Sequence, residues 1–109
     1  MKLPFRKRKT SLIVPDQFKA GLEQAVHDFE HRKYAEALKN VDTVLSQDPD
    51  IAVAVYLKAR IIWEGFRYSP AAKQCVQQVM DLVSDRDHAL HKMASELLSR
   101  MARPYQIVD

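Results

Sequence analysis

A 34-residue internal repeat is the feature that most restricts how this 109-residue chain can fold. Moving the sequence along itself by 34 positions superimposes like residues on like: Ala25 on Ala59, Phe29 on Trp63, Glu30 on Glu64, Tyr34 on Tyr68, and Ala37 on Ala71. A fixed period of this size is typical of stacked repeat architectures, in which each unit buries its apolar face against the next. We therefore expect successive units that pack in a row.

Apolar spacing within the repeats predicts helices. Apolar residues recur at steps of three and four, and no segment sustains an alternation of apolar and polar residues. We expect a first helix after Pro15 up to a polar turn at 31–33, and a second over 34–47. A third follows over 51–64, a fourth up to Val83, and a fifth from Ser84 or Asp85 to about residue 102. The chain is thus predicted to be all-α.

Residues that cap or stop helices set the expected ends. Asp16, Asp50 and Ser69 each precede an apolar stripe, where a side-chain oxygen can accept a hydrogen bond from a free backbone N–H. The pair at 48–49, Asp-Pro, is expected to end the second helix, because proline cannot extend the hydrogen-bond ladder. Gly65 is expected to end the third helix.

The turn between the first two helices resembles the tetratricopeptide repeat (TPR) family. The resemblance lies in the run FEHRKYAEAL at 29–38 and in Asp48-Pro49 at the spacing of the family's terminal proline. It implies a TPR-like α-α superhelix of two antiparallel helix hairpins, over about 18–51 and 52–85, with a fifth capping helix over about 86–102. The domain would cover 16–103, between a basic tail over 1–15 and a C-terminal tail over 104–109. The chain departs from the family where large apolar residues of the first helix are replaced by Gly21, Gln24 and Asp28, and where Val83 stands in place of the second proline.

In TPR proteins the first helices of successive units line a concave face that binds peptides. The resemblance, carried over residue by residue, implies these groove positions: Lys19, Leu22, Val26, Phe29, Glu30, Val53, Tyr56, Leu57, Arg60, Trp63, Glu64, Asp87, Leu90, His91 and Ala94. The family's carboxylate clamp uses lysine, asparagine and arginine, whereas the matching positions here are Leu22, Val26 and Leu57. Binding of a chaperone's C-terminal tail is therefore not expected.

The implied groove is apolar and carries an aromatic row of Phe29, Tyr56 and Trp63. Exposed apolar patches on small proteins mark contact sites, and aromatic anchors dominate binding energies. We expect the groove to bind an amphipathic helix or an apolar segment of another protein. The alternative is that Phe29 and Trp63 are simply buried between helices.

No catalytic or metal-binding constellation is found in the sequence. His27 and His31 are four residues apart and His88 and His91 three apart, but two ligands do not make a metal site. Cys75 falls on the apolar side of its helix, where an inert thiol is expected. We therefore expect a protein that is not an enzyme and that needs no cofactor or metal.

Positive charge is concentrated at the start of the chain. The first nine residues contain five basic residues and no acidic one, whereas the rest contains 12 basic and 14 acidic residues. The basic residues are Lys2, Arg6, Lys7, Arg8 and Lys9. They form either a solvated tail or a weak, salt-sensitive contact with anionic membrane lipid or nucleic acid. Too few apolar residues follow for a signal peptide, so we expect a cytoplasmic protein, membrane-peripheral if the tail contacts lipid.

Three functional classes remain open from the sequence. The first is an adaptor or scaffold that binds another protein. The second is a small secretion-type chaperone that sequesters an apolar helix of a partner subunit. The third is an assembly unit that forms homo-oligomers through the ends of its helical array.

Overall fold

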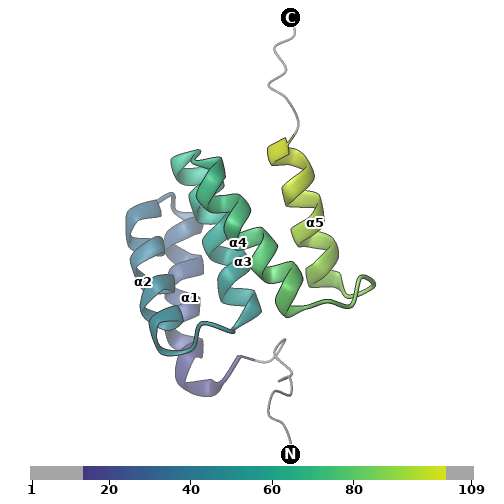
Figure 1. Cartoon of the computed structure of the whole chain (residues 1–109). Coiled ribbons are helices and arrows are strands. Elements are labelled where there is room, and N and C mark those ends of the chain that lie inside the picture. Colours follow the sequence, from purple (N-terminus) through teal and green to yellow (C-terminus); the bar gives the residue numbers. More distant parts are fainter. Residues whose placement is uncertain (1–13, 103–109) are drawn as a thin grey trace, which may run out of the picture.

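The computed structural model describes residues 14–102, which form five α-helices and one π-helical turn (Figure 1). In chain order these are α1 (Asp16–Glu30), α2 (Tyr34–Gln47), α3 (Ala52–Arg60), the π-helical turn η1 (Ile61–Phe66), α4 (Ser69–Leu82) and α5 (Ala89–Ala102). The all-α prediction is confirmed for this part of the chain. The five basic residues of the N-terminal tail and the C-terminal tail over 104–109 lie outside the described residues. Within 14–102, no helix is both long enough and apolar enough to cross a bilayer.

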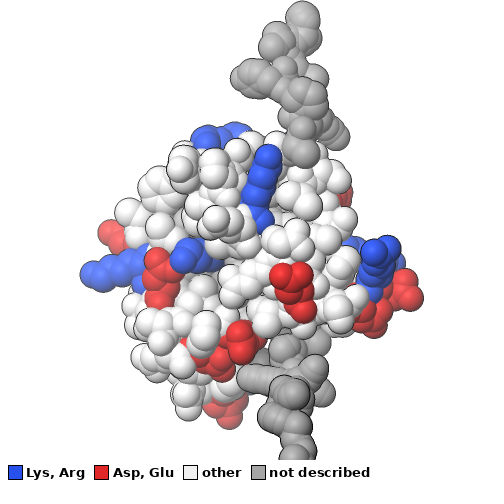
Figure 2. All heavy atoms as spheres, viewed as in Figure 1, with Lys and Arg blue, Asp and Glu red and all other residues white. Residues whose placement is uncertain are grey.

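Successive helices pack side by side. α1 contacts α2, α2 contacts α3, α3 contacts α4, and α4 contacts α5. In Figure 1 the purple and blue helices α1 and α2 lie at one side of the molecule, and the yellow-green α5 lies at the other. On the face shown in Figure 2, acidic and basic side chains are interspersed with uncharged surface.

Two apolar clusters form the core, and α3 and its continuation η1 contribute to both. Ala54 and Ile61 belong to the cluster built with α1 and α2, whereas Val55 and Ile62 belong to the cluster built with α4 and α5. A helix that is apolar on two faces is buried between neighbours. The other buried members of the first cluster are Phe18, Leu22, Ala25, Ala37, Val41, Val44 and Ile51. Those of the second are Ala52, Ala59, Ala72, Val76, Val79, Val83, Leu90, Ala94, Leu97 and Met101.

The expected helix caps are each wrong by one residue. The residues before α1, α3 and α4 are Pro15, Ile51 and Tyr68, in place of Asp16, Asp50 and Ser69. Backbone carbonyls make the first-turn contacts: Phe18 N–H donates to the Pro15 carbonyl at 2.9 Å, and Ala54 N–H donates to that of Ile51 at 2.9 Å.

The fifth helix begins at Ala89, later than the expected start at Ser84 or Asp85. The Asp85 carboxylate instead accepts a hydrogen bond from the Asp87 N–H at 2.9 Å, which forms a turn. His88 caps α5, because its Nδ1 accepts a hydrogen bond from the Leu90 N–H at 3.0 Å. His88, considered above only as one of two histidines with too few ligands for a metal site, thus has a structural role.

Gly65 does not end the third helix, contrary to expectation. The helix continues through η1 to Phe66, and the chain then turns at Arg67, whose φ of 54° is left-handed. A π-helical turn contains more residues than an α-helical one. Glycine is required here by close approach: a Cβ at position 65 would lie 2.7 Å from Tyr34 Cβ and closer still to its Cγ.

The wide turn changes the repeat from 34 to 35 residues. Before it, Ala25 and Ala59 are both fully buried, as the 34-residue shift predicts. After it, α2 and α4 begin 35 residues apart, and the fully buried alanine of α4 is Ala72, whereas Ala71 is half-buried. The expected equivalences of Tyr34 with Tyr68 and of Ala37 with Ala71 are therefore wrong by one position. The structurally equivalent pairs are Ala37 with Ala72, Val41 with Val76, Val44 with Val79, and Ala59 with Ala94.

Candidate functional site

A hollow of about 600 Å³ lies between α1 and the start of α3. This α1–α3 hollow is lined by Val14, Lys19, Leu22, Glu23, Val26, His27, Glu30 and Val53. Leu22 is 7% exposed and forms part of the core, whereas Val26 is 39% and Val53 37% exposed. The structure thus brings together five of the residues expected in a groove: Lys19, Leu22, Val26, Glu30 and Val53.

Helical spacing places these side chains on one side of α1. Lys19, Leu22, Val26 and Glu30 follow one another at steps of three and four, which puts them along one helical face. That face adjoins the buried stripe of α1, so Leu22 belongs to both. Val53, at the second position of α3, completes the wall from the other helix.

The rim of the α1–α3 hollow favours a cationic occupant. Glu23 and Glu30 lie in its wall. The one lysine there, Lys19, forms an ion pair with Asp16 at 3.1 Å. Such an exposed pair contributes little stability, but it balances the lysine's charge locally. The two glutamates therefore leave this wall net acidic.

Arg60 links the two helices beside the hollow. Its guanidinium lies 5.2 Å from the centroid of the Phe29 ring, and its Nε donates to Glu64 Oε2 at 2.7 Å. The hydrogen bond to Glu64 raises the pKa of Arg60 above its ordinary value, against the opposing effect of burial. Phe29 also meets the Tyr34 ring edge-on, with 5.9 Å between centroids. These half-buried side chains therefore contact one another across α1 and α3.

The three aromatic residues expected to form a row divide between two environments. Tyr56 lines a small hollow of about 110 Å³ with Arg60 and with residues of α5. Tyr56 also contributes to the raised pKa of Arg60. Phe29, on α1, contacts the same guanidinium with its ring. Trp63 instead packs against the second apolar cluster, with the Arg67 guanidinium 5.2 Å from its ring centroid. Leu57 packs against the first cluster.

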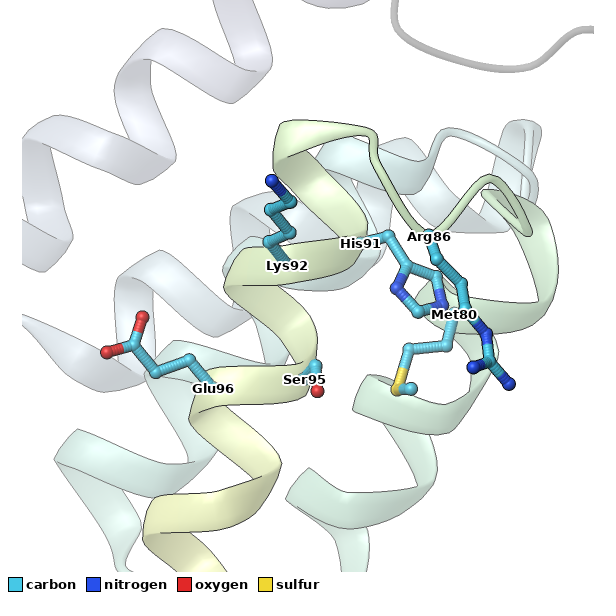
Figure 3. A pocket seen from close by; sticks show the side chains of 6 residues that line it. All are labelled: Met80, Arg86, His91, Lys92, Ser95 and Glu96. Carbon is cyan, nitrogen blue, oxygen red and sulfur yellow. The ribbon is translucent and has the colours of Figure 1, made fainter.

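The expected groove residues of α5 lie elsewhere. Leu90 is buried in the second apolar cluster. His91 lines a hollow of about 550 Å³ between α4 and α5, where it lies next to Met80 and Arg86 (Figure 3). Lys92 and Glu96 extend from α5 away from Met80 (Figure 3). His91 is thus separated from the α1–α3 hollow by the intervening helices.

A buried carboxylate, missed by the sequence analysis, joins α1 to α2. Asp28 is 5% exposed, and its two oxygens accept hydrogen bonds from Gln24 Nε2 at 3.0 Å and Asn40 Nδ2 at 2.8 Å. Its backbone carbonyl accepts a further bond from the Lys33 N–H at 2.8 Å. The signal in the sequence was Asp28 at a position where an apolar residue was expected.

His27 and His31 interact with each other at the end of α1. Their ring centroids are 4.2 Å apart, and His31 Nδ1 lies 2.8 Å from the His27 carbonyl oxygen, to which it donates. Across residues 14–102, no group of three or more His, Cys, Asp or Glu side chains is placed to hold a metal ion. The hydrogen bond from the His31 ring instead satisfies a backbone carbonyl in the last turn of α1.

Cys75 is half-buried against the second cluster, near an ion pair between Lys58 Nζ and Asp42 Oδ1 at 2.8 Å. Burial raises the pKa of the Cys75 thiol above its ordinary value. The charge of Lys58 acts in the opposite direction, and that of Asp42 adds to the rise. The thiolate is therefore disfavoured at neutral pH.

Cys75 is expected to react with iodoacetamide at pH 8 more slowly than the same thiol in the urea-unfolded chain, because less of it is thiolate. The difference between the two alkylation rates should become smaller as the pH rises through the raised pKa of Cys75. Lys58→Ala should slow the reaction further and Asp42→Asn should accelerate it, as measured by mass spectrometry. Equal effects of the two substitutions would show that access, not charge, governs the rate.

Comparisons of the chain with protein-family models, with curated protein sequences and with solved structures gave no match. The functional proposal therefore depends on the geometry of the hollows and on the residues that line them.

Proposed function

We propose that this chain is a tetratricopeptide-like repeat domain that binds a segment of another protein in the α1–α3 hollow. The domain consists of the hairpin α1–α2, the hairpin α3–η1–α4, and α5 as a closing helix. The successive contacts of these helices and the fully buried alanines, Ala25, Ala59 and Ala94, support this reading. The activity is binding without catalysis.

One observation carries the proposal: two valines are exposed inside a hollow whose floor is apolar. Val26 and Val53 come from different helices and face the same space above Leu22. Exposed apolar side chains that are scattered singly need no explanation, but those that converge in a concavity indicate a contact surface. A partner that covers them removes apolar area from water, which stabilises the complex.

The partner segment is an amphipathic helix, or an extended apolar segment, with basic residues beside its apolar side chains. Its apolar side chains, at helical spacing, would rest on the two valines. Its basic residues would face Glu23 and Glu30. Charge complementarity of this kind favours one orientation and increases the association rate.

Substituting both valines, as Val26→Asp and Val53→Asp, is expected to abolish partner capture while the fold remains stable. Both side chains are more than a third exposed, so the substitutions leave the core intact. The matched control is Met93→Asp on α5, where the methionine is 43% exposed and lies outside the α1–α3 hollow. Affinity capture with the full chain, quantified by mass spectrometry, measures the effect, and thermal melting checks the fold.

A protein retained by the wild type and by Met93→Asp, but lost from the double variant, supports the proposal. Equal capture by all three proteins would place the contact elsewhere on the surface. If the double variant melts well below the control, Val26→Thr with Val53→Thr gives a milder change at the same two positions, and the same comparison applies.

A further inference from the structure

The chain enters its described part at the edge of the α1–α3 hollow. Val14, the first described residue, lines the hollow and packs against the first apolar cluster. Pro15 follows in an extended conformation, with φ −56° and ψ 143°, before α1 begins. Residues 1–13 are therefore attached directly to the wall of the hollow.

The sequence of that attached segment matches the chemistry of the hollow. Leu12 and Ile13 are apolar and immediately precede Val14 in the sequence, and Val14 lines the hollow. Two residues, at positions 10 and 11, separate Leu12 from the basic run over 6–9. The wall of the hollow carries two glutamates. The attached segment thus carries apolar and basic residues, the two kinds of side chain that the apolar floor and the glutamates of the hollow favour.

We propose that residues 1–13 of this chain bind in the α1–α3 hollow of the same molecule. Leu12 and Ile13 cover the two exposed valines, and the basic run lies against Glu23 and Glu30. The segment thereby occupies the surface proposed for a partner. The inference goes beyond the proposed function, because this contact forms in the isolated chain.

The length of the segment is sufficient. Thirteen residues reach about 40 Å when extended, at about 3.3 Å per residue. The 15 residues of α1 span about 22 Å. The segment can therefore run the whole length of α1. Because it is covalently attached, a weak intrinsic affinity is enough: a short tether raises the effective concentration to about the millimolar range.

Paramagnetic relaxation NMR on the full chain tests this contact. A nitroxide is attached at Thr10→Cys in a Cys75→Ser background, so that it is the only thiol label. We expect selective loss of amide signals from Val26, Val53 and their neighbours. The matched control carries the label at Ser99→Cys, on an exposed position of α5.

Three further changes identify the forces that hold the segment in the hollow. The signal loss should decrease in 1 M salt, where the Debye length falls to about 3 Å, and in the variant Glu23→Lys with Glu30→Lys. It should also decrease when Leu12 and Ile13 are replaced by serine. Signal loss that is spread evenly over the helices, or that is insensitive to all three changes, would overturn the proposal.

Mixing spin-labelled and unlabelled molecules distinguishes binding of the segment within one molecule from binding to a second copy. Spin-labelled protein of natural isotope content is added to ¹⁵N protein without a label. Signal loss at the hollow of the ¹⁵N protein would show that the segment binds a second copy, which overturns binding within one molecule. No partner is present in these samples, so failure here leaves the capture experiment with Val26 and Val53 as a separate test of the proposed function.

Discussion

Replacing Gly65 with alanine is expected to lower the free energy of unfolding by about 1–3 kcal/mol, the range for an overpacked site. The new Cβ would lie 2.7 Å from the Cβ and Cδ1 of Tyr34 and closer still to its Cγ. These atoms are near the backbone of α2 and cannot move aside easily. Elsewhere in a helix the same substitution stabilises by about 0.5–1 kcal/mol, so the expected sign is reversed here. Urea denaturation of the two proteins measures the difference.

Gly21→Ala is the matched control, because it is the same substitution in another helix. A Cβ at position 21 would lie 3.2 Å from Val44 Cγ2, a side-chain end that can shift. The helical preference of alanine and this tight contact oppose each other, so a small net change is expected. In a Tyr34→Ala background, the effect of Gly65→Ala should shrink, since two of the three closest atoms are gone. Equal changes in the free energy of unfolding for Gly65→Ala and Gly21→Ala would contradict the close approach of Gly65 to Tyr34.

Replacing Asn40 with alanine is expected to lower the free energy of unfolding by about 1.5–3 kcal/mol, the range for hydrogen bonds to charged groups. The amide of Asn40 donates to the Asp28 carboxylate at 2.8 Å. That carboxylate is 5% exposed, so water does not readily replace the lost donor. Thermal and urea denaturation at neutral pH measure the change.

The control for Asn40 is an amide–carboxylate pair on the surface. Gln77 Nε2 donates to Asp81 Oδ1 at 3.4 Å on α4, and both residues are exposed. Gln77→Ala should therefore cost no more than about 0.5 kcal/mol, the value for exposed pairs four residues apart. Losses of similar size for Asn40→Ala and Gln77→Ala would mean that the buried carboxylate does not tie α1 to α2.

The sequence pattern predicts α1, α2 and α4 well because each of these helices buries a single apolar stripe. The expected bounds of α2, 34–47, are those observed, since the polar turn before it and Asp48-Pro49 after it are strong local signals. The caps fail by one residue because an aspartate or serine can occupy either side of a helix start at little cost. Start and end residues are the least determined part of any helix.

The extra residue in η1 could not be predicted from composition. Gly65 is a strong signal for a helix end, and the adjacent alanines at 71 and 72 fit either register. Only the contact between Tyr34 and Gly65 and the burial of Ala72 select the 35-residue spacing. Asp28 was missed for a similar reason: its partner Asn40 comes from another helix, at a distance that no local pattern encodes.

The candidate site could be predicted where its residues share a helix face. Lys19, Leu22 and Val26 were implied by the family resemblance, and they lie together in the hollow because they share one face of α1. The contribution of α5 could not be predicted in the same way. Leu90 is buried in the second cluster and His91 lies with Met80, because these positions are set by the packing of α5 against α4, which no pattern within α5 encodes.

α3 and η1 contribute residues to both apolar clusters, and this limits how the molecule can be divided. A fragment that ends after α2 would leave Phe18 and Leu22 without Ile51, Ala54 and Ile61, which complete the first cluster. A fragment that begins at α4 would equally lose Val55 and Ile62. Although the repeat suggests two separable hairpins, neither half contains a complete interior. Any shortening of the chain must therefore spare α3 and η1, whose residues belong to both clusters.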